Sequence, residues 1–305
     1  MSIIFMGTPE FAVASLQALL SAGEKVAAVI TAPDKPAGRG QKLQESAVKK
    51  FALAHNLPVL QPTNLKDPDF LETLKTYQPD LQVVVAFRML PKAVWDMPEK
   101  GTINLHGSLL PQYRGAAPIN HAIINGETES GVSTFLLQHE IDTGNILFSE
   151  KVPILPDDTA EDLHDKLMET GAQLLVKTVK AVKEGNVEGQ AQPEDNGQLK
   201  AAPKIHKEDC KIDWNKPVQE VYNFIRGLSP YPTTFTYLEN KILKIYKAKP
   251  EVTQVTEEPG TPVSDGKTYL KFACQDGYIH VLDLQIQDKK RMNTADFLRG
   301  FRLKS

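Results

Sequence analysis

An amide, an imidazole and a carboxylate occur in the middle of this 305-residue chain at positions that suit chemistry. Asn104 and His106 are separated by one residue, and Asp142 follows within the run 139–144. Transfer of an acyl-type group needs a donor for a developing oxyanion, a group that moves a proton, and a partner that orients that group. The three side chains therefore predict an enzyme that transfers such a group.

The local pattern places two of these side chains together. Residues 101–105 form an apolar run typical of a strand, so Asn104 and His106 project to the same side near its C-terminal end. Ligands of open α/β sheets bind at that end of the strands. An Asn and a His at a strand end can also just satisfy a turn. The Pro-bounded loop 107–115 favours a site, because its apolar residues suit the wall of a flat, partly apolar ligand.

The first part of the chain, residues 1–188, alternates strand and helix patterns. Continuous apolar runs separated by helical spacing predict an α/β fold with a mainly parallel sheet and helices on both faces. Asp158-Thr159-x-Glu161-Asp162 predicts the capped start of a long helix. The runs lie at residues 2–5, 26–30, 81–86, 101–105 and 132–137.

The composition changes after residue 188. Residues 189–204 hold almost no large apolar side chain and are predicted to be a linker. Residues 205–305 carry one amphipathic helix, 218–226, and then short strands that predict a small β-barrel. The strands are expected at 234–238, 242–246, 269–273 and 278–284, the last two joined across Asp276-Gly277.

Charge is unevenly distributed. The chain has a formal net charge of −3, but residues 200–305 hold 18 Lys and Arg against 13 Asp and Glu, and residues 1–199 hold 17 against 25. A basic C-terminal third suits an anionic partner held mainly at that end. A solvated surface with a chance asymmetry is the alternative.

Several classes of function are disfavoured. Gly7-Thr8-Pro9-Glu10 lacks the spacing of a dinucleotide or ATP loop, which argues against NAD and ATP. Cys210 and Cys274 are too few for a disulfide framework, and no His or Cys spacing suggests a metal. No apolar stretch approaches about 18 residues, so we expect a cytoplasmic protein with no membrane partner. Nothing in the pattern indicates an obligate protein partner.

Longer motifs resemble a known family, the enzymes that take the formyl group from 10-formyltetrahydrofolate. Asn104, His106 and Asp142 match its active-site signature together with residues 108–111 and 113–118. Residues 5–12, 33–40 and 225–232 resemble more closely the members that act on methionyl-tRNA. These motifs span nearly the whole chain. The resemblance implies a Rossmann-like catalytic domain at 1–188, a linker at 189–204, and an OB-like tRNA-binding domain at 205–305.

The resemblance also implies a reaction and its residues. The formyl group would pass from 10-formyltetrahydrofolate to the α-amino group of methionine on initiator methionyl-tRNA, giving N-formylmethionyl-tRNA for translation initiation without a metal. Asn104 would stabilise the oxyanion, His106 would stabilise charge or move a proton, and Asp142 would orient His106 and help accept the amine proton. The folate pocket would be formed by Ser108, Leu109, Leu110, Pro111, Phe87, Met89, Leu90 and Gln138.

Cationic residues are the expected tRNA contacts. In the resembling family a basic loop inserts beside the acceptor stem, and Arg39 stands at the place of its critical arginine. An ordinary solvated loop is the alternative for this segment. Many family members have Tyr-Gly where this chain has Phe87-Arg88, which leaves the role of Arg88 open. The expected contacts are Arg39, Lys35, Lys42, Lys204, Lys207, Lys289 and Arg291.

Two other functions compete with this one. A formyltransferase could act on a sugar nucleotide or another small amine, although such an acceptor needs neither Arg39 nor a basic barrel. An RNA-binding module on an inactive catalytic fold is the second alternative. The complete set of Asn104, His106 and Asp142 argues against it.

Overall fold

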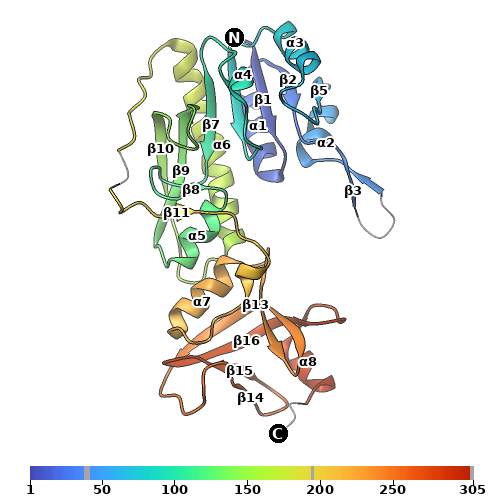
Figure 1. Cartoon of the computed structure of the whole chain (residues 1–305), viewed down its shortest axis with the longest axis vertical. Helices are drawn as coiled ribbons and strands as arrows, with labels where there is room; N and C mark the ends of the chain where they lie inside the picture. The colour runs from blue at the N-terminus through green and yellow to red at the C-terminus, as the bar shows by residue number, and fades with distance from the viewer. Residues whose placement is uncertain (38–41, 194–195, 303–305) are drawn as a thin grey trace. The chain divides into compact units, whose positions relative to one another are not determined.

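The computed structural model describes residues 1–37, 42–193 and 196–302, and the chain forms two compact units (Figure 1). The first unit comprises Met1–Gly115, Gly131–Val152 and His164–Ala201. The second comprises Ala116–Ser130, Pro153–Leu163 and Ala202–Ser305. The chain therefore passes between the units more than once. The division into domains at 1–188 and 205–305 stays a prediction, because compactness does not report which segments fold independently.

A seven-stranded sheet forms the centre of the first unit. Five strands are parallel, as the apolar runs predict, and the next strand, β9, is antiparallel to β7. In spatial order the strands are β5 (Val59–Leu60), β2 (Val26–Ile30), β1 (Ile3–Gly7), β6 (Leu81–Val85), β7 (Thr102–His106), β9 (Glu129–Leu136) and β10 (Ile146–Pro153).

Helices cover both faces of this sheet, so the predicted Rossmann-like α/β architecture is confirmed. Ile4 and Met6 of β1 share a buried cluster with Phe70 and Leu74 of α3 and with Val94 of α4. On the other face, helix α1 packs against Gly7, and helix α6 packs against Leu105 and Val132. The helices of this unit are α1 (Glu10–Ser21), α2 (Ala47–Ala54), α3 (Pro68–Thr76), α4 (Lys92–Trp95) and most of α6 (Ala160–Glu184).

The predicted capping box at the start of α6 is present. The backbone N–H of Asp162 donates to Thr159 Oγ1 at 3.2 Å, and the backbone N–H of Thr159 donates to Asp162 Oδ2 at 2.8 Å. Each side chain satisfies a backbone donor that the first turn of a helix leaves unpaired. The helix therefore begins where the sequence predicts.

The basic loop near residue 39 is flanked by two short strands. Strands β3 (Lys35–Ala37) and β4 (Lys42–Gln44) pair in an antiparallel hairpin, with Lys35 opposite Gln44. Asp34 anchors the base of this hairpin, since its carboxylate accepts hydrogen bonds from Lys49 and from Gln61 at 2.7 Å. These two bonds hold the pKa of Asp34 below its usual value.

The second unit contains a curved antiparallel sheet, as the hairpin signals predict. Helix α7 packs against this sheet, and its Val221 and Ile225 belong to the apolar core of the unit. Helix α5 packs against α7. Its elements are α5 (Pro118–Ile124), η1 (Glu208–Cys210), α7 (Val218–Gly227), β12 (Thr234–Leu238), β13 (Lys241–Val252), β14 (Pro262–Ser264), β15 (Leu270–Ala273), β16 (Gly277–Ile286), β17 (Met292–Asn293) and α8 (Thr294–Gly300). The short strands β8 (Arg114–Gly115) and β11 (Ala201–Ala202) form a separate pair.

Both cysteines are buried in the second unit. Burial raises the pKa of the Cys210 thiol, and it raises the pKa of Cys274 to about 12. Both groups are therefore thiols rather than thiolates at neutral pH. Among the described residues, no helix is long and apolar enough to span a membrane.

Candidate active site

His106 and Asp142 lie next to each other in the first unit. Nδ1 of His106 is 3.9 Å from Oδ2 of Asp142, and the two side chains are only 8% and 11% exposed. Charges that are this little exposed are screened weakly by water and salt. The carboxylate of Asp142 therefore faces Nδ1 of the imidazole in a setting with little solvent between them.

A backbone carbonyl contacts the other nitrogen of the imidazole. Nε2 of His106 is 2.9 Å from the carbonyl oxygen of Tyr113. A carbonyl oxygen can only accept, so Nε2 carries a hydrogen. In the neutral ring Nδ1 therefore keeps the lone pair, on the side of Asp142. Nδ1 is the atom that can take up and release a proton.

The loop after β7 that supplies this carbonyl is held by local hydrogen bonds. Ser108 Oγ donates to the carbonyl of Gln112 at 2.6 Å, and the N–H of Leu110 donates to Ser133 Oγ at 3.1 Å. Ser133 Oγ in turn donates to the carbonyl of Ser108 at 2.8 Å. The N–H of Tyr113 donates to the carbonyl of Lys200. The loop is thus anchored at both ends.

Asp142 is positioned through its backbone as well as its side chain. The residue has a positive φ of 55°, a conformation that Asp tolerates better than most residues. Its Oδ2 accepts a hydrogen bond from the N–H of Gly115 at 3.0 Å. This bond fixes one carboxylate oxygen and holds it beside His106.

Gln192 was not predicted as a site residue, but it holds the segment that carries Asp142. Its Nε2 donates to the carbonyls of Asp142 and Gly144, each at 2.8 Å. Its Oε1 accepts from Arg114 at 2.7 Å. Gln192 lies in the polar stretch 189–204, whose composition gave no signal of this contact. A part of the predicted linker therefore supports the site.

Asn104 lies two residues before His106 on the same side of β7. It is opposite Val84 of β6 and Phe135 of β9, and it is partly exposed. Its side chain is therefore accessible from solvent, as a group that contacts a substrate must be. The C-terminal ends of β1, β6 and β7 lie at this edge of the sheet because the three strands are parallel.

Arg88 fixes the segment after β6. Its guanidinium donates to the carbonyls of Pro62 and Thr63, the latter at 3.0 Å, and lies 5.6 Å from the centre of the Phe87 ring. Met89 is 74% exposed, whereas Leu90 packs into the core cluster. Arg88 therefore ties the segment after β6 to the backbone of residues 62 and 63.

The other predicted folate residues differ in exposure. Ser108 and Leu110 are buried, Leu109 and Pro111 are partly buried, and Gln138 is exposed. Little of the Leu90 and Leu110 side chains is open to a ligand, because both are buried. Leu109 and Met89 offer apolar surface that a ligand can reach.

The predicted tRNA contacts belong partly to the first unit and partly to the second. Arg39 lies outside the described residues, Lys42 belongs to β4, and Lys35 is exposed on β3. In the second unit, Lys204, Lys207 and Lys289 are exposed, and Arg291 pairs with Asp283 at 2.6 Å.

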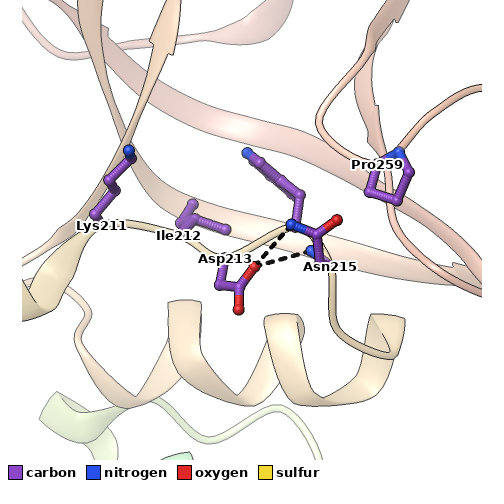
Figure 2. Close-up of a pocket in the computed structure, with 6 residues that line it drawn as sticks. Lys211, Ile212, Asp213, Asn215 and Pro259 are labelled. Atoms are coloured by element: carbon purple, nitrogen blue, oxygen red, sulfur yellow. Dashed lines mark hydrogen bonds between the residues drawn. The ribbon is translucent and has the colours of Figure 1, made fainter.

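A surface pocket of about 360 Å³ lies in the second unit (Figure 2). Its lining contains none of the predicted site residues. Asp213 Oδ1 accepts hydrogen bonds from the backbone and side chain of Asn215, so this part of the rim is held by its own contacts. The lining residues are Lys211, Ile212, Asp213, Trp214, Asn215 and Pro259.

Comparison with known families identifies the two parts of the chain. Residues 1–179 match the formyl transferase family, and residues 204–302 match the formyl transferase C-terminal domain. The chain belongs to the formyl transferase family. This chain is 53% identical over 308 residues to a methionyl-tRNA formyltransferase of Bacteroides fragilis. The match covers 99% of this chain and 95% of that protein.

Solved structures support the same fold for this formyl transferase. A methionyl-tRNA formyltransferase from Clostridium thermocellum matches with a TM-score of 0.60 and 16% identity over 95% of this chain and 100% of that chain. A sugar 3N-formyl transferase, solved in the presence of dTDP and 5-N-formyl-THF, matches with a TM-score of 0.67 and 23% identity over 95% and 99%.

Asp142→Asn is expected to lower kcat for formyl transfer by about two to four orders of magnitude. The change keeps the shape of the side chain and removes the negative charge beside His106, and loss of a proton-transfer arrangement typically costs about 10²–10⁴ in rate. Steady-state kinetics measure the change. Asp165→Asn is a matched control, because Asp165 also contacts a histidine Nδ1, that of His164 at 3.0 Å, on the surface. Equal losses in the two variants would contradict this role.

Gln192→Ala is expected to lower kcat about tenfold and to speed amide hydrogen exchange in residues 138–145. Two backbone carbonyls lose their donor, and the segment around Asp142 opens more often. Gln192→Glu separates the two sides of this residue, since Glu still accepts from Arg114 but cannot donate to the carbonyls. A Gln192→Glu variant with normal exchange would show that the contact to Arg114 is what matters.

Proposed function

We propose that this formyl transferase moves the formyl group of 10-formyltetrahydrofolate to the α-amino group of methionine on initiator methionyl-tRNA. The observation that carries the proposal is 53% identity, over 99% of the chain, to a protein named methionyl-tRNA formyltransferase. The buried pair of His106 and Asp142 beside the partly exposed Asn104 supports it. The reaction serves translation initiation, so its place is the cytoplasm.

The donor would lie along the loops that follow β6 and β7. Leu109 and Met89 supply apolar surface, and Arg88 presents the backbone of its segment in a fixed conformation. A pterin needs this combination, because its ring faces are apolar and its edge carries donors and acceptors. The other residues of the proposed pocket either contact the folate or hold the loops that do. They are Phe87, Leu90, Ser108, Leu110, Pro111 and Gln138.

Catalysis begins when the methionine amine attacks the formyl carbon. The carbonyl oxygen becomes an oxyanion, and the Nδ2–H of Asn104 donates a hydrogen bond to it. Such a donor acts chiefly in the transition state, where the charge has developed. The position of Asn104 near the C-terminal ends of the parallel strands β6 and β7 supports this role, because open α/β sheets bind ligands at that edge.

His106 then carries a proton between the two nitrogens of the reaction. Nδ1 takes the proton of the attacking amine, and Asp142 stabilises the resulting imidazolium. When the tetrahedral intermediate collapses, the bond between the formyl carbon and N10 breaks, and N10 receives the proton. The products are N-formylmethionyl-tRNA and tetrahydrofolate. The hydrogen bond from Nε2 to Tyr113 holds the ring in one orientation throughout.

A direct assay tests the proposal. The purified chain is incubated with 10-formyltetrahydrofolate labelled in the formyl group and with methionyl initiator tRNA, and acid-precipitable label on the tRNA is counted. We expect incorporation that depends on both the folate and the methionyl group. A dTDP-amino sugar replaces the tRNA in a second arm, because the sugar formyl transferase shares the fold. Transfer to the sugar alone would establish the small-amine alternative.

The acceptor would be held by cationic residues in both units. Lys35 belongs to β3 and Lys42 to β4, and Arg39 falls between them in the sequence. The second unit adds Lys204, Lys207, Lys289 and Arg291. Contacts of this kind neutralise phosphates and fix the orientation of the tRNA. No metal is needed for this proposed scheme.

Arg39→Ala is expected to lower kcat/KM for methionyl-tRNA by about 10- to 100-fold while the dissociation constant of the folate stays unchanged. Hydrogen bonds to charged groups contribute about 1.5–3 kcal/mol. Arg39→Lys should be nearly as poor, because a point charge cannot replace a planar fork of donors. Lys35→Ala, four residues earlier in the sequence and on β3, is the control and should lose less. Weakened folate binding by Arg39→Ala would place this residue in the donor pocket instead.

A further inference from the structure

The outward face of β12 and β13 in the second unit gathers aromatic side chains. Phe235 and Tyr237 alternate with the buried Thr234, Thr236 and Leu238 and therefore point away from the core. Their rings meet edge to face, with centroids 6.0 Å apart. Tyr237 is 53% exposed, so a large part of its ring is open to solvent.

The same face continues across β13 and β16. Register places Lys244 opposite Phe235 and also opposite Gln285 of β16, so the three side chains share one side of the sheet. Tyr246, two residues after Lys244, donates its hydroxyl hydrogen to Gln285 at 2.9 Å. The aromatic face therefore consists of Phe235, Tyr237, Lys244, Tyr246 and Gln285 on the three neighbouring strands β12, β13 and β16.

Cations lie among these rings. Lys211 Nζ is 5.7 Å from the centre of the Tyr237 ring, and the Arg291 guanidinium is 4.2 Å from that of Tyr246. Arg291 is partly neutralised by Asp283. Within the described part of the chain, Lys211 and Lys244 form no ion pair with a carboxylate. Their charge is available to an anionic partner.

A second group of rings and cations lies on the outer side of the same sheet, but its lysine is already paired with a carboxylate. Lys271 lies 3.7 Å from the centre of the Tyr278 ring and 6.0 Å from that of Tyr269. However, its ammonium pairs with Glu251 at 3.1 Å, and His280 contacts the same carboxylate at 2.6 Å. These contacts hold the pKa of Glu251 below its usual value, so it stays charged. The second group is therefore internally neutralised.

We propose that the aromatic face of β12, β13 and β16 binds a single-stranded stretch of RNA, with unpaired bases stacked on Tyr237 and Phe235 and phosphates held by Lys211 and Lys244. Within the proposed function, on which this assignment to the tRNA rests, the stretch belongs to the tRNA substrate. The cationic residues of the second unit that are proposed as backbone contacts would not distinguish paired from unpaired nucleotides.

The chemistry of the face favours unpaired bases over a duplex. A base exposes its flat surface only when it is unstacked, and aromatic side chains on a small β-barrel accept that surface with little regard to sequence. Duplex contacts instead use cations that track two phosphate strands. The aromatic face exposes its rings between Lys211 and Lys244, and this arrangement suits unpaired bases rather than a duplex.

Fluorescence anisotropy with the full chain tests the proposal. The probe is a labelled single-stranded RNA of about ten nucleotides, within the site size of one small barrel, and the same strand annealed to its complement. We expect Tyr237→Ala to weaken binding of the single strand about 5- to 100-fold, as loss of a base stack typically does, with little change for the duplex. Tyr237→Phe should retain binding within about twofold, because the ring remains.

Charge and position are tested separately. Lys244→Gln should weaken binding and reduce the slope of log K against log salt by about 0.7 for each phosphate of the single strand that the variant no longer neutralises. Tyr269→Ala is the matched control, since Tyr269 also lies near a lysine but in the neutralised group. Thermal melts and circular dichroism verify that each variant is folded.

Three outcomes overturn the proposal: no effect of Tyr237→Ala on the single strand, an equal loss with Tyr269→Ala, or an equal loss on the duplex. Formyl transfer to methionyl-tRNA is measured on the same preparations. Normal transfer with no dependence on Tyr237 in RNA binding refutes the aromatic face alone. Absent transfer with Tyr237-dependent RNA binding refutes the proposed reaction and leaves the RNA site standing.

Discussion

His106→Ala is expected to lower kcat for formyl transfer by about two to four orders of magnitude with little loss of stability. Removal of a proton shuttle typically costs about 10²–10⁴ in rate. The side chain lies beside two polar groups, the carbonyl of Tyr113 and the carboxylate of Asp142. Asn104→Ala should show a loss of similar size through the oxyanion. Single-turnover rates with methionyl-tRNA, together with thermal melts, give both quantities.

His55→Ala is the matched control for this experiment. His55 also contacts a backbone carbonyl, that of Phe51 at 2.9 Å, but it is exposed and has no carboxylate partner among the described residues. Its replacement should leave kcat within about twofold of the parent. If His106→Ala and Asn104→Ala both stayed within tenfold of the parent, the proposed catalytic site would be wrong.

Gly144→Ala is expected to lower kcat by about a hundredfold and to destabilise the first unit by about 1–3 kcal/mol. A Cβ at this position would lie 1.6 Å from the carbonyl oxygen of Leu136, which is backbone and cannot rotate away. The segment from residue 138 to residue 145 must move, and Asp142 moves with it. A displacement of about 1 Å at a catalytic group is enough for a loss of this size.

Chemical denaturation and kinetics on the same variant check this result. Gly300→Ala is the control, because a Cβ there meets nothing within 4 Å. It should leave both stability and rate near those of the parent. A Gly144→Ala protein with normal kcat would show that the position of Asp142 tolerates the shift, which would weaken its assignment to catalysis.

The fold could be predicted from the sequence because its strands are continuous apolar runs. Residues 26–30 and 234–238 coincide with β2 and β12, and helix 218–226 differs from α7 by one residue. Strand β10 was not predicted. It is at the edge of the sheet and contains Ser149, Glu150 and Lys151 in succession, so neither an apolar run nor an alternating pattern marks it.

The candidate site could be predicted in part, because period two alone places Asn104 and His106 on one side of a strand. The remainder depends on groups that composition does not reveal. The carbonyl of Tyr113 fixes the imidazole, and any residue type could supply that carbonyl. Gln192 reaches Asp142 from 50 residues further along the chain. Polar residues that are far apart in the sequence can make a contact without producing any periodic pattern in the sequence.

The two buried thiols give an experimental advantage. Because only a thiolate reacts readily with maleimides, Cys274, with a pKa of about 12, and the shielded Cys210 should stay unmodified at neutral pH. A cysteine placed at Leu43, which is 68% exposed on the β3–β4 hairpin, would then be the only position to take a fluorophore. The parent sequence thus permits site-specific labelling of the segment next to Arg39 without first removing its native cysteines.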